Sequence, residues 1–392
     1  MRAYRADVAF DGEREIAGGA VVFVDGATIV GVEPGTAAAP DGCPVTYRPG
    51  TTLLPGLVDA HVHLCADSTP TALEQLPRLS EEQLDDIVAH SRQVELAAGV
   101  TTVRDLGDHE WTVVERHRNH PDGPNVLASG PPITSVGGHC AHMGGAVSGI
   151  EALRSAVAER AERGADAVKV MTSGGLTTGT EVLACQFTLR ELRAVVEESH
   201  RLGLPVAAHA HALTAVEMCV EAGVDTIEHC SGMTAEGLRM PPELADRIAE
   251  AGIVVSPTMG TRLRGDPPPH IKALLERTGI RLEDRIPLVG VLIRAGVTII
   301  NGGDSGINPA KPHGLLPVSV AELVEAGMTP AQALASATSV ATDAIGLGGR
   351  TGRLRRGMDA DLVLVDGNPL QDIGALHDVR TVVSRGREVP TG

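Results

Sequence analysis

Residues 200–211 read HRLGLPVAAHAH, and residues 219–229 read CVEAGVDTIEH. In both stretches a glycine ends a helical segment, a short apolar strand follows, and the strand stops at a histidine. Glycine is the usual residue just beyond a helix C-terminus, because the backbone there has a positive φ. A continuous apolar strand is typical of a parallel sheet that is covered on both faces. The two stretches therefore predict repeated helix-to-strand units with histidines at the strand ends.

The same pattern recurs between about residue 53 and residue 345. It is found in LLPGLVDAHVH (53–63), LAAGVTTVRD (96–105), the stretch around 125–129, AERGADAVKV (161–170), IAEAGIVVSPT (248–258) and LIRAGVTIINGGD (292–304). Helix starts support it, since Ser80 with Gln83 and Thr188 with Glu191 have the capping-box spacing. About eight such units close naturally into a barrel. We therefore predict an α/β fold whose main domain, residues 53–349, is a (β/α)8 TIM-type barrel.

The two ends of the chain have a different pattern. Residues 21–32, VVFVDGATIVGV, are two alternating strands around Asp25-Gly26, which is typical of a β-hairpin. Residues 360–369 and 380–389 are again short strands with glycine-containing turns. We predict that residues 1–52 and 350–392 together form one small β-sandwich-like domain built from both termini.

Composition argues against several classes of protein. With 2% aromatic residues and a net charge of −17, the chain has neither the basic stripe nor the stacking side chains of a nucleic-acid binder. It contains no apolar run of the roughly 18–20 residues that a membrane-spanning helix needs, and its first residues are polar and charged. The six cysteines form no C-x-x-C pair, which argues against a disulfide framework or a thiolate zinc site. We expect a cytoplasmic enzyme with no nucleic-acid or membrane partner.

Polar residues stand where the predicted strands end. They are His61, His63, Asp105, Lys169, His209, His211, His229 and Asp304. In a (β/α)8 barrel the chemistry lies at this end of the strands. Imidazoles and carboxylates are ligands that suit Zn²⁺ and similar ions. His61 and His63 in addition share one face of their strand, because side chains alternate along it. The sequence therefore predicts a metal centre at the mouth of the barrel.

Lys169 is the most informative single residue. The chain has only three lysines, Lys169, Lys272 and Lys311, and the first stands inside the apolar strand AVKVM, residues 167–171. A buried ammonium is strongly disfavoured unless it is paired or neutral. A neutral amine can add CO₂ to form a carbamate, an anion able to bridge two metal ions. The competing interpretation is a lysine that extends to a carboxylate, and the surrounding histidines favour the carbamate.

His209, His229 and Asp304 complete the predicted centre. The two histidines end consecutive strands, which favours a second metal over two buried structural histidines. Asp304 follows two glycines in TIINGGDSG, residues 298–306, where the backbone can approach the barrel centre closely. A carboxylate there can ligate a metal and accept the proton of the attacking water. The competing interpretation of Asp304 is a helix N-cap.

Four other histidines need no function. His90 and His200 lie in predicted helical stretches, and His117 and His120 lie in the charged run VVERHRNHPD. We expect all four side chains to be solvated.

The chain resembles the amidohydrolase superfamily in five segments, which follow one another in the family's order: HVHL (61–64), AVKVM (167–171), PVAAHAH (205–211), TIEH (226–229) and NGGDSG (301–306). Within the superfamily these segments are similar to the branch of imidazolonepropionase-like proteins and metal-dependent Xaa-Pro and Xaa-Arg dipeptidases. The resemblance covers nearly the whole chain, including the split β domain. It implies a metal-dependent hydrolase that acts on a small-molecule amide substrate, and it leaves a homo-oligomer open.

The resemblance implies six ligands for two divalent metal ions: His61, His63 and Asp304 around the more buried ion, His209 and His229 around the more exposed ion, and a carboxylated Lys169 bridging both together with a hydroxide. The expected ions are Zn²⁺, with Mn²⁺ or Co²⁺ as alternatives, and CO₂ supplies the lysine carbamate. Two ions about 3.5–4 Å apart lower the pKa of a shared water enough to provide hydroxide at neutral pH. Asp304 would take the proton of the hydroxide and deliver it to the leaving amine.

The resemblance also implies residues around the substrate. His139, in GGHCAHMGG (137–145), would polarise the scissile carbonyl as a second catalytic residue. His142 in the same loop, His211 and His313 in KPHG would face the substrate.

Two other functions stay open. A hydrolytic deaminase or ring-opening imidazolonepropionase typically uses one metal, lacks the lysine of the fourth strand and has an acid after the histidine of the fifth, whereas this chain has Lys169 and His211 there. The second alternative is an inactive scaffold, and the presence of all six expected ligands argues against it. Cys140 and Cys230 stand where relatives more often have glycine, which leaves the shape of the pocket open. We therefore predict a binuclear amidohydrolase that cleaves a dipeptide or an N-acyl amino acid, with specificity residues that the sequence does not identify.

Overall fold

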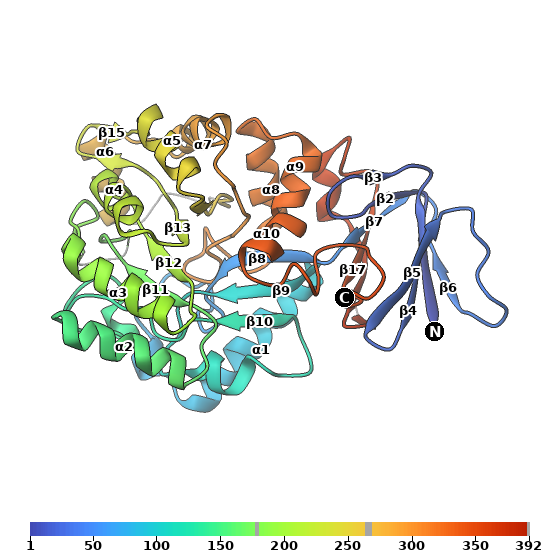
Figure 1. Cartoon of the computed structure of the whole chain (residues 1–392), viewed down its shortest axis with the longest axis horizontal. Coiled ribbons are helices and arrows are strands. Elements are labelled where there is room, and N and C mark those ends of the chain that lie inside the picture. Colours follow the sequence, from blue (N-terminus) through green and yellow to red (C-terminus); the bar gives the residue numbers. More distant parts are fainter. Residues whose placement is uncertain (177–179, 263–268, 390–392) are drawn as a thin grey trace.

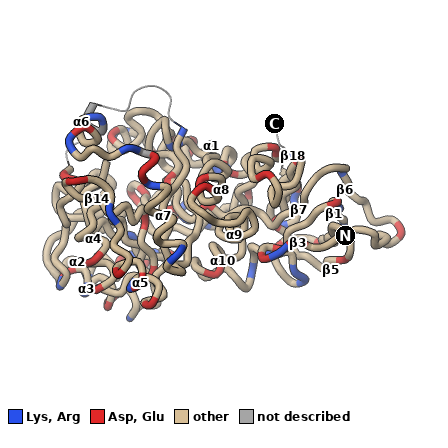
Figure 2. Tube along the Cα trace, turned by 90° about the horizontal axis from the view of Figure 1, so that it is seen from above, with Lys and Arg blue, Asp and Glu red and all other residues tan. Residues whose placement is uncertain are grey.

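A computed structural model describes residues 1–176, 180–262 and 269–389. Figure 1 shows two parts side by side along the long axis, a larger body of strands and helices and a smaller group of strands that holds both ends of the chain. The larger body confirms the predicted α/β class. Acidic and basic residues are interspersed along both parts (Figure 2), so the negative net charge is not gathered on one element.

The parallel strands of the body form two sheets, in the orders β10-β9-β8 and β11-β12-β13-β16. Their bounds are β8 (Leu57–Val62), β9 (Val100–Asp105), β10 (Asn125–Ala128), β11 (Val168–Met171), β12 (Val206–His209), β13 (Thr226–Glu228) and β16 (Val254–Ser256). Every pair of neighbouring strands within them is parallel. Every residue of β8, β9, β11, β12 and β13 is buried, as expected for strands covered on both faces.

Single parallel bridges connect the two sheets with each other and with the segment after α7 (Arg285–Arg294). They join Ile133 with Val170, Val255 with Ile299, and Val62 with Ser305. The expected eighth strand is therefore present only as isolated bridges. Its backbone turns at Asp304, whose φ of +54° lies in the left-handed region and cannot continue an extended strand.

Gly302 and Gly303 let this turn pass close to β8. A Cβ on Gly302 would lie 2.8 Å from the Cβ of His61, and a Cβ on Gly303 would lie 2.3 Å from Oγ of Ser305. Without side chains at these two positions, the backbone N–H of Asp304 donates to the carbonyl of His61 at 2.7 Å. Asp304 is thus held directly beside the end of β8.

Helices cover the parallel strands (Figure 1). Their bounds are α1 (Glu81–Ala97), α2 (Ile150–Glu162), α3 (Leu189–Arg201), α4 (Leu213–Ala222), α5 (Pro242–Glu250), α6 (Pro269–Thr278), α7, α8 (Leu316–Glu325), α9 (Pro330–Ser336) and α10 (Ser339–Ala344). The predicted capping boxes begin α1 and α3, where Ser80 and Thr188 accept hydrogen bonds from the N–H groups of Gln83 and Glu191. Between β9 and β10, a stretch described throughout, the helical segment is a short π turn, η2 (Val113–His117).

Smaller elements lie in the connections. They are the hairpin of β14 (Met233–Thr234) and β15 (Gly237–Leu238) and the 3-10 turns η1 (Leu76–Arg78), η3 (Ala141–Met143), η4 (Leu282–Asp284) and η5 (Ile373–His377).

The second part consists of two sheets with the orders β5-β4-β1-β6 and β19-β18-β17-β7-β2-β3. Their bounds are β1 (Arg2–Ala6), β2 (Val8–Phe10), β3 (Glu15–Ile16), β4 (Ala20–Asp25), β5 (Thr28–Pro34), β6 (Val45–Tyr47), β7 (Thr51–Pro55), β17 (Leu362–Asp366), β18 (Val379–Ser384) and β19 (Arg387–Val389). β17 pairs antiparallel with β7 along its whole length. Buried side chains of both sheets, among them Tyr4, Val22, Leu53 and Leu364, form one apolar cluster. The expected hairpin of β4 and β5 is present, with Gly26 at φ +57°.

The structure also bears on three other expectations from the sequence. All six cysteines are free, and among the described residues no helix combines the length and the apolar character needed to cross a bilayer. His90, His120 and His200 are exposed, but the expectation of a solvated His117 is wrong. Its ring is buried, because η2 packs it against α1 with Nε2 2.7 Å from Oδ1 of Asp85.

A substitution at Gly12 tests how tightly the two ends of the chain pack together. Its φ is +104°, and a Cβ would lie 2.4 Å from the backbone oxygen of Gly352. We expect Gly12→Ala to lower the free energy of unfolding by about 2–4 kcal/mol, from backbone strain and overpacking together. Gly18→Ala, at φ +77° with nothing within 4 Å of the new Cβ, is the control and should cost about 1–2 kcal/mol. Urea unfolding of both variants measures the difference, and equal losses would contradict the close approach.

Candidate metal centre

The side chains at the carboxyl ends of the parallel strands meet in one cavity of about 150 Å³. Those that line it include His61, His63, His139, Lys169, His209, His211, His229 and Asp304. All eight are buried. They come from β8, β11, β12 and five connecting segments, so the parallel arrangement of the strands brings together residues from more than 240 positions of the chain.

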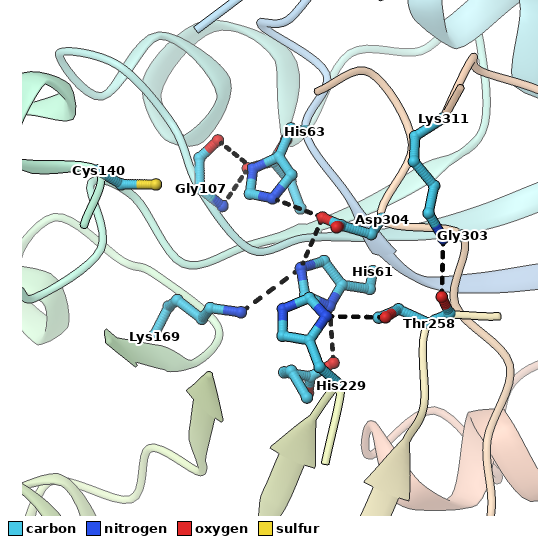
Figure 3. Close-up of polar contacts among 12 residues, drawn as sticks. His61, His63, Gly107, Cys140, Lys169, His229, Thr258, Gly303, Asp304 and Lys311 are labelled. Atoms are coloured by element: carbon cyan, nitrogen blue, oxygen red, sulfur yellow. Dashed lines mark hydrogen bonds and ion pairs between the residues drawn. The ribbon is translucent and has the colours of Figure 1, made fainter. Parts of the chain in front are cut away.

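His61, His63 and Asp304 form one group of potential metal ligands. Nε2 of His61 lies 3.4 Å and Nε2 of His63 lies 3.2 Å from the same oxygen, Oδ1 of Asp304 (Figure 3). Nζ of Lys169 lies 3.4 Å from Nε2 of His61, so the lysine stands directly beside this group. Three ligand atoms around one point are what a Zn²⁺ site needs from the protein.

His209, His211 and His229 form a second group, whose ligand atoms lie within 4.8 Å of one another. The ring centroids of His209 and His229 are 4.6 Å apart, and those of His211 and His229 are 4.5 Å apart. His61 connects the groups, since its ring centroid lies 5.3 Å from that of His229. His211, expected only to face the substrate, is therefore also placed to offer a ligand atom.

Burial favours the neutral form of five imidazoles that line the cavity. It lowers the pKa of His61 to about 4 and the pKa values of His139 and His211 to about 3. The pKa values of His209 and His229 are lowered well below the ordinary value for the same reason. A neutral imidazole has a free lone pair, which is the form that binds a metal ion.

Four histidines of the two groups have a polar contact at one ring nitrogen. The contacts are Nδ1 of His63 with the carbonyl of Gly107 at 3.1 Å, Nε2 of His209 with the carbonyl of Gly174 at 3.1 Å, Nδ1 of His211 with Oγ of Ser231 at 2.9 Å, and Nδ1 of His229 with Oγ1 of Thr258 at 2.8 Å. Such contacts orient a metal-ligating histidine and select its tautomer.

His61 is held by a buried ion pair that sequence reasoning missed. Nδ1 of His61 lies 2.8 Å from Oε2 of Glu228, and Nη2 of Arg104 donates to Oε1 of Glu228 at 2.9 Å. Although burial favours the neutral acid, Arg104 and His61 lower the pKa of Glu228 to about 2, so the carboxylate is charged. The available signal was the presence of charged residues inside two apolar strands, Glu228 in TIEH and Arg104 in VTTVRD.

Lys169 has no carboxylate partner that could explain its burial. Its amine lies 3.4 Å from Nε2 of His61, and among the described residues it forms no ion pair. This argues against the interpretation of a lysine extending to a carboxylate. Burial lowers the pKa of Lys169 to about 8, which increases the fraction of neutral amine at physiological pH.

Asp304 is ionised in spite of its burial. Burial favours the neutral acid, but the hydrogen bond with His63 and the electrostatic effect of His61, His63 and Lys311 outweigh it and hold the pKa of Asp304 well below its usual range. The φ of +54° and the hydrogen bond to His61 show that the carboxylate is positioned by a tight turn. It does not cap a helix, because the next helix, α8, begins at Leu316.

Of the remaining residues that the sequence singled out, two line the cavity and two do not. The ring of His139 lies in the cavity wall with its centroid 4.7 Å from that of His209. Cys140 lines the cavity as well, with Sγ 3.5 Å from Nε2 of His139. His142 is half-buried and does not line the cavity. Cys230 is buried and does not line the cavity either.

The expectation that His313 faces the substrate does not agree with its position. Nδ1 of His313 lies 3.0 Å from Oε1 of Glu95, and Nε2 lies 3.0 Å from the carbonyl of Ala66. Both ring nitrogens are thus engaged by α1 and by the segment after β8, outside the lining of the cavity. The pattern KPHG holds a loop in place here.

Comparisons with known proteins agree with this arrangement. A model of the amidohydrolase family matches residues 52–389. The chain is 28% identical over 364 residues to ochratoxinase of Aspergillus niger, covering 84% of this chain and 73% of that protein. It is 27% identical over 429 residues to imidazolonepropionase of Rubrobacter xylanophilus, covering 97% and 93%. The solved structure of a Xaa-Pro dipeptidase with bound methionine in its active site matches with a TM-score of 0.86 at 26% identity and covers 99% of each chain.

The neutral state of His211 predicts a pH-dependent stability. Between pH 6.5 and its folded pKa of about 3, the unfolded chain binds a proton at this residue that the folded chain does not bind. Stability is therefore lost as pH falls below 6.5, by about 2 kcal/mol at pH 5.

Glutamine does not titrate, so metal-free His211→Gln should gain stability relative to wild type by about this amount between pH 7.5 and pH 5. Urea unfolding at the two pH values measures it. His90→Gln, at an exposed histidine, is the control, and a pH-independent gap for His211→Gln would contradict the prediction.

Proposed function

Since the chain belongs to the amidohydrolase family and is a hydrolase that acts on carbon–nitrogen bonds, we propose that it cleaves the amide bond of a dipeptide or an N-acyl amino acid at a centre of two divalent metal ions. The observation that carries this proposal is the convergence of two groups of ligand atoms, with Lys169 beside His61, in a single cavity. The similarity to the structure of a Xaa-Pro dipeptidase, which by its name cleaves an amide bond, supports the reaction class.

The donor set fits a pair of borderline ions such as Zn²⁺. Neutral imidazoles and one ionised carboxylate are the ligands that these ions prefer. His61, His63 and Asp304 would hold one ion, and the histidines of the second group, His209 and His229 with His211 adjacent, would hold the other. Lys169, buried and without a carboxylate partner among the described residues, would bridge them as its carbamate.

Bound ions would supply a hydroxide from water at neutral pH and polarise the substrate carbonyl. Asp304 is the residue that moves the proton. Its carboxylate is ionised and is held by His63, so Oδ1 or Oδ2 can accept a proton and pass it to the leaving nitrogen. His139 is neutral at pH 7 and lies in the cavity wall, so a ring N–H can donate to the developing oxyanion of the carbonyl.

The proposed fold of the body is the closed (β/α)8 barrel. Its support is the series of parallel contacts from β8 through β9 and β10, across the bridge of Ile133 with Val170, through β11 to β16, and back to β8 through the segment of Ile299 and Ser305. Closure would leave no free sheet edge beside the site.

Ring opening of a cyclic amide is the second candidate, because the match to imidazolonepropionase extends over 97% of the chain. Lys169 in β11 and His211 after β12 favour the two-metal reaction over this one. The two reactions differ in their products, since ring opening releases no amine.

Product analysis tests the proposed reaction. Zinc-loaded protein is incubated with a panel of dipeptides and N-acyl amino acids, and free amino acid and ammonia are measured separately. We expect release of amino acid without ammonia. Asp304→Asn should lower kcat by about 10²-fold or more while a metal ion is still bound, because it removes the proton carrier. Asp246→Asn, at an exposed position of α5, is the matched control. Release of ammonia alone, or near-normal kcat in Asp304→Asn, would contradict the proposal.

Metal content tests the role of Lys169. We expect wild-type protein to bind two divalent ions per chain and Lys169→Ala to lose at least one, since the lysine would contribute to both ions. Lys272→Ala, which removes an exposed lysine, should keep both. Elemental analysis after gel filtration measures the ratio. A wild-type preparation that is fully active with a single ion would rule out the bridging carbamate.

A further inference from the structure

Two cationic side chains, Lys311 and Arg285, line the same cavity as the metal-ligand groups. Lys311 lies in the loop that follows Asp304, and Arg285 begins α7. Figure 3 shows Lys311 on the far side of Asp304 from Lys169, with its amine directed to the backbone at Thr258. Neither residue is needed by the metal centre or by the proton transfer proposed above.

The same stretch of backbone holds both cations in place. Nζ of Lys311 donates to the carbonyl oxygens of Thr258 at 2.7 Å and of Met259 at 3.3 Å. Nη2 of Arg285 donates to the carbonyl oxygens of Thr258 at 3.1 Å and of Pro257. Because they share the oxygen of Thr258, the two charged groups are close neighbours. Their remaining N–H groups are available for a ligand.

This pair of cations makes its polar contacts with backbone carbonyl oxygens. Among the described residues, no carboxylate forms an ion pair with Lys311 or Arg285. The carboxylates of Asp304 and Glu322 exert a charge effect on both cations without an ion pair, but Asp304 is held by His63 and Glu322 accepts a hydrogen bond from the N–H of Gly260 at 2.7 Å. Burial, and next the charge of Arg285, lower the pKa of Lys311 to about 8. Backbone carbonyls orient the two cations but do not neutralise them, so the arrangement is incomplete without an anion.

The contrast with Arg104 makes the missing counter-ion informative. Arg104 is also a buried cation, and it is matched by Glu228 at 2.9 Å. Lys311 is also one of only three lysines in the chain, and it stands at a position where its amine is buried. A lysine and an arginine together at a cavity wall favour a carboxylate, which can accept hydrogen bonds on both oxygens.

Part of the wall of this cavity is aliphatic. Leu238 of β15, Leu274 and Leu275 of α6, and Ile280 contribute to it. An apolar side chain can be buried against these residues. The cavity therefore combines a reactive centre, a cationic pair and an apolar surface within one space of about 150 Å³.

We propose that Lys311 and Arg285 bind a free carboxylate of the substrate, so that the substrate is an N-acyl amino acid or dipeptide whose residue on the leaving side is aliphatic. This inference rests on the proposed amide hydrolysis for its biological meaning, but the binding of the carboxylate does not depend on catalysis. It predicts discrimination against substrates in which the carboxylate is replaced by a carboxamide, because the two cations would then stay unpaired in the complex.

Binding of a matched pair of ligands tests the carboxylate site. Calorimetric titration of zinc-loaded protein with 4-methylpentanoate and with 4-methylpentanamide compares a charged and a neutral ligand of nearly the same shape. We expect Lys311→Met and Arg285→Met each to weaken binding of the acid by about tenfold or more and to leave binding of the amide within about twofold. Lys272→Met, the same change at an exposed residue of α6, should bind both ligands as wild type does. Any direct contact of the acid with zinc is common to all variants and cancels in this comparison.

The outcomes separate this inference from the proposed function. If Lys311→Met and Arg285→Met bind the acid as tightly as wild type, the carboxylate site is wrong whatever reaction the enzyme performs. If the variants lose acid binding but wild-type protein hydrolyses no amide in the product analysis, the carboxylate site stands and the proposed reaction fails. Binding of the amide by each variant shows that its cavity is intact, and a loss that affects both ligands equally in both variants would also overturn the proposal.

Discussion

Parallel pairing is the constraint on which the site depends. Because β8 to β13 and β16 all run in the same direction, the last residue of each strand arrives at the same edge. His61 on β8, Lys169 on β11 and His209 on β12 are more than 30 positions apart in the chain, yet they line one cavity. Asp304 reaches them by a different route, through a left-handed turn that two glycines allow. The backbone therefore positions the ligands before any side chain adjusts.

Charge inside the body is distributed in a consistent way. The imidazoles are neutral because burial disfavours their protonated form, and Glu228 is ionised because Arg104 and His61 stabilise it. Two cations, Lys311 and Arg285, line the cavity and form no ion pair among the described residues. Groups that are left uncompensated in a buried place indicate what a ligand must supply, which here is negative charge.

The second part of the molecule, which consists of the two smaller sheets, connects both ends of the chain to the larger body. β7 is continuous with β8 except for Gly56, and β17 pairs with β7 along its length, so strands from near both termini brace the start of β8, the first parallel strand of the body. His61 and His63 follow directly from this braced segment. Rigid support of this kind holds catalytic ligands more tightly than a loop would.

The sequence by itself determined the α/β class, the strand ends and the residues that meet there. The glycine before each strand, the apolar runs, the capping boxes of Ser80 and Thr188, and the spacing of His61 and His63 are local features, and local backbone preferences act over a few residues. Only the tertiary structure decided the pairing of Glu228 with His61, the inclusion of His211 among the ligand atoms, the burial of His117 against Asp85, and the engagement of His313 by Glu95. The eighth strand, regular in its pattern, became a turn because Asp304 adopts a left-handed backbone beside β8. These outcomes depend on contacts between residues as far apart as 218 positions, and a local pattern cannot specify which distant side chain will satisfy a buried polar group.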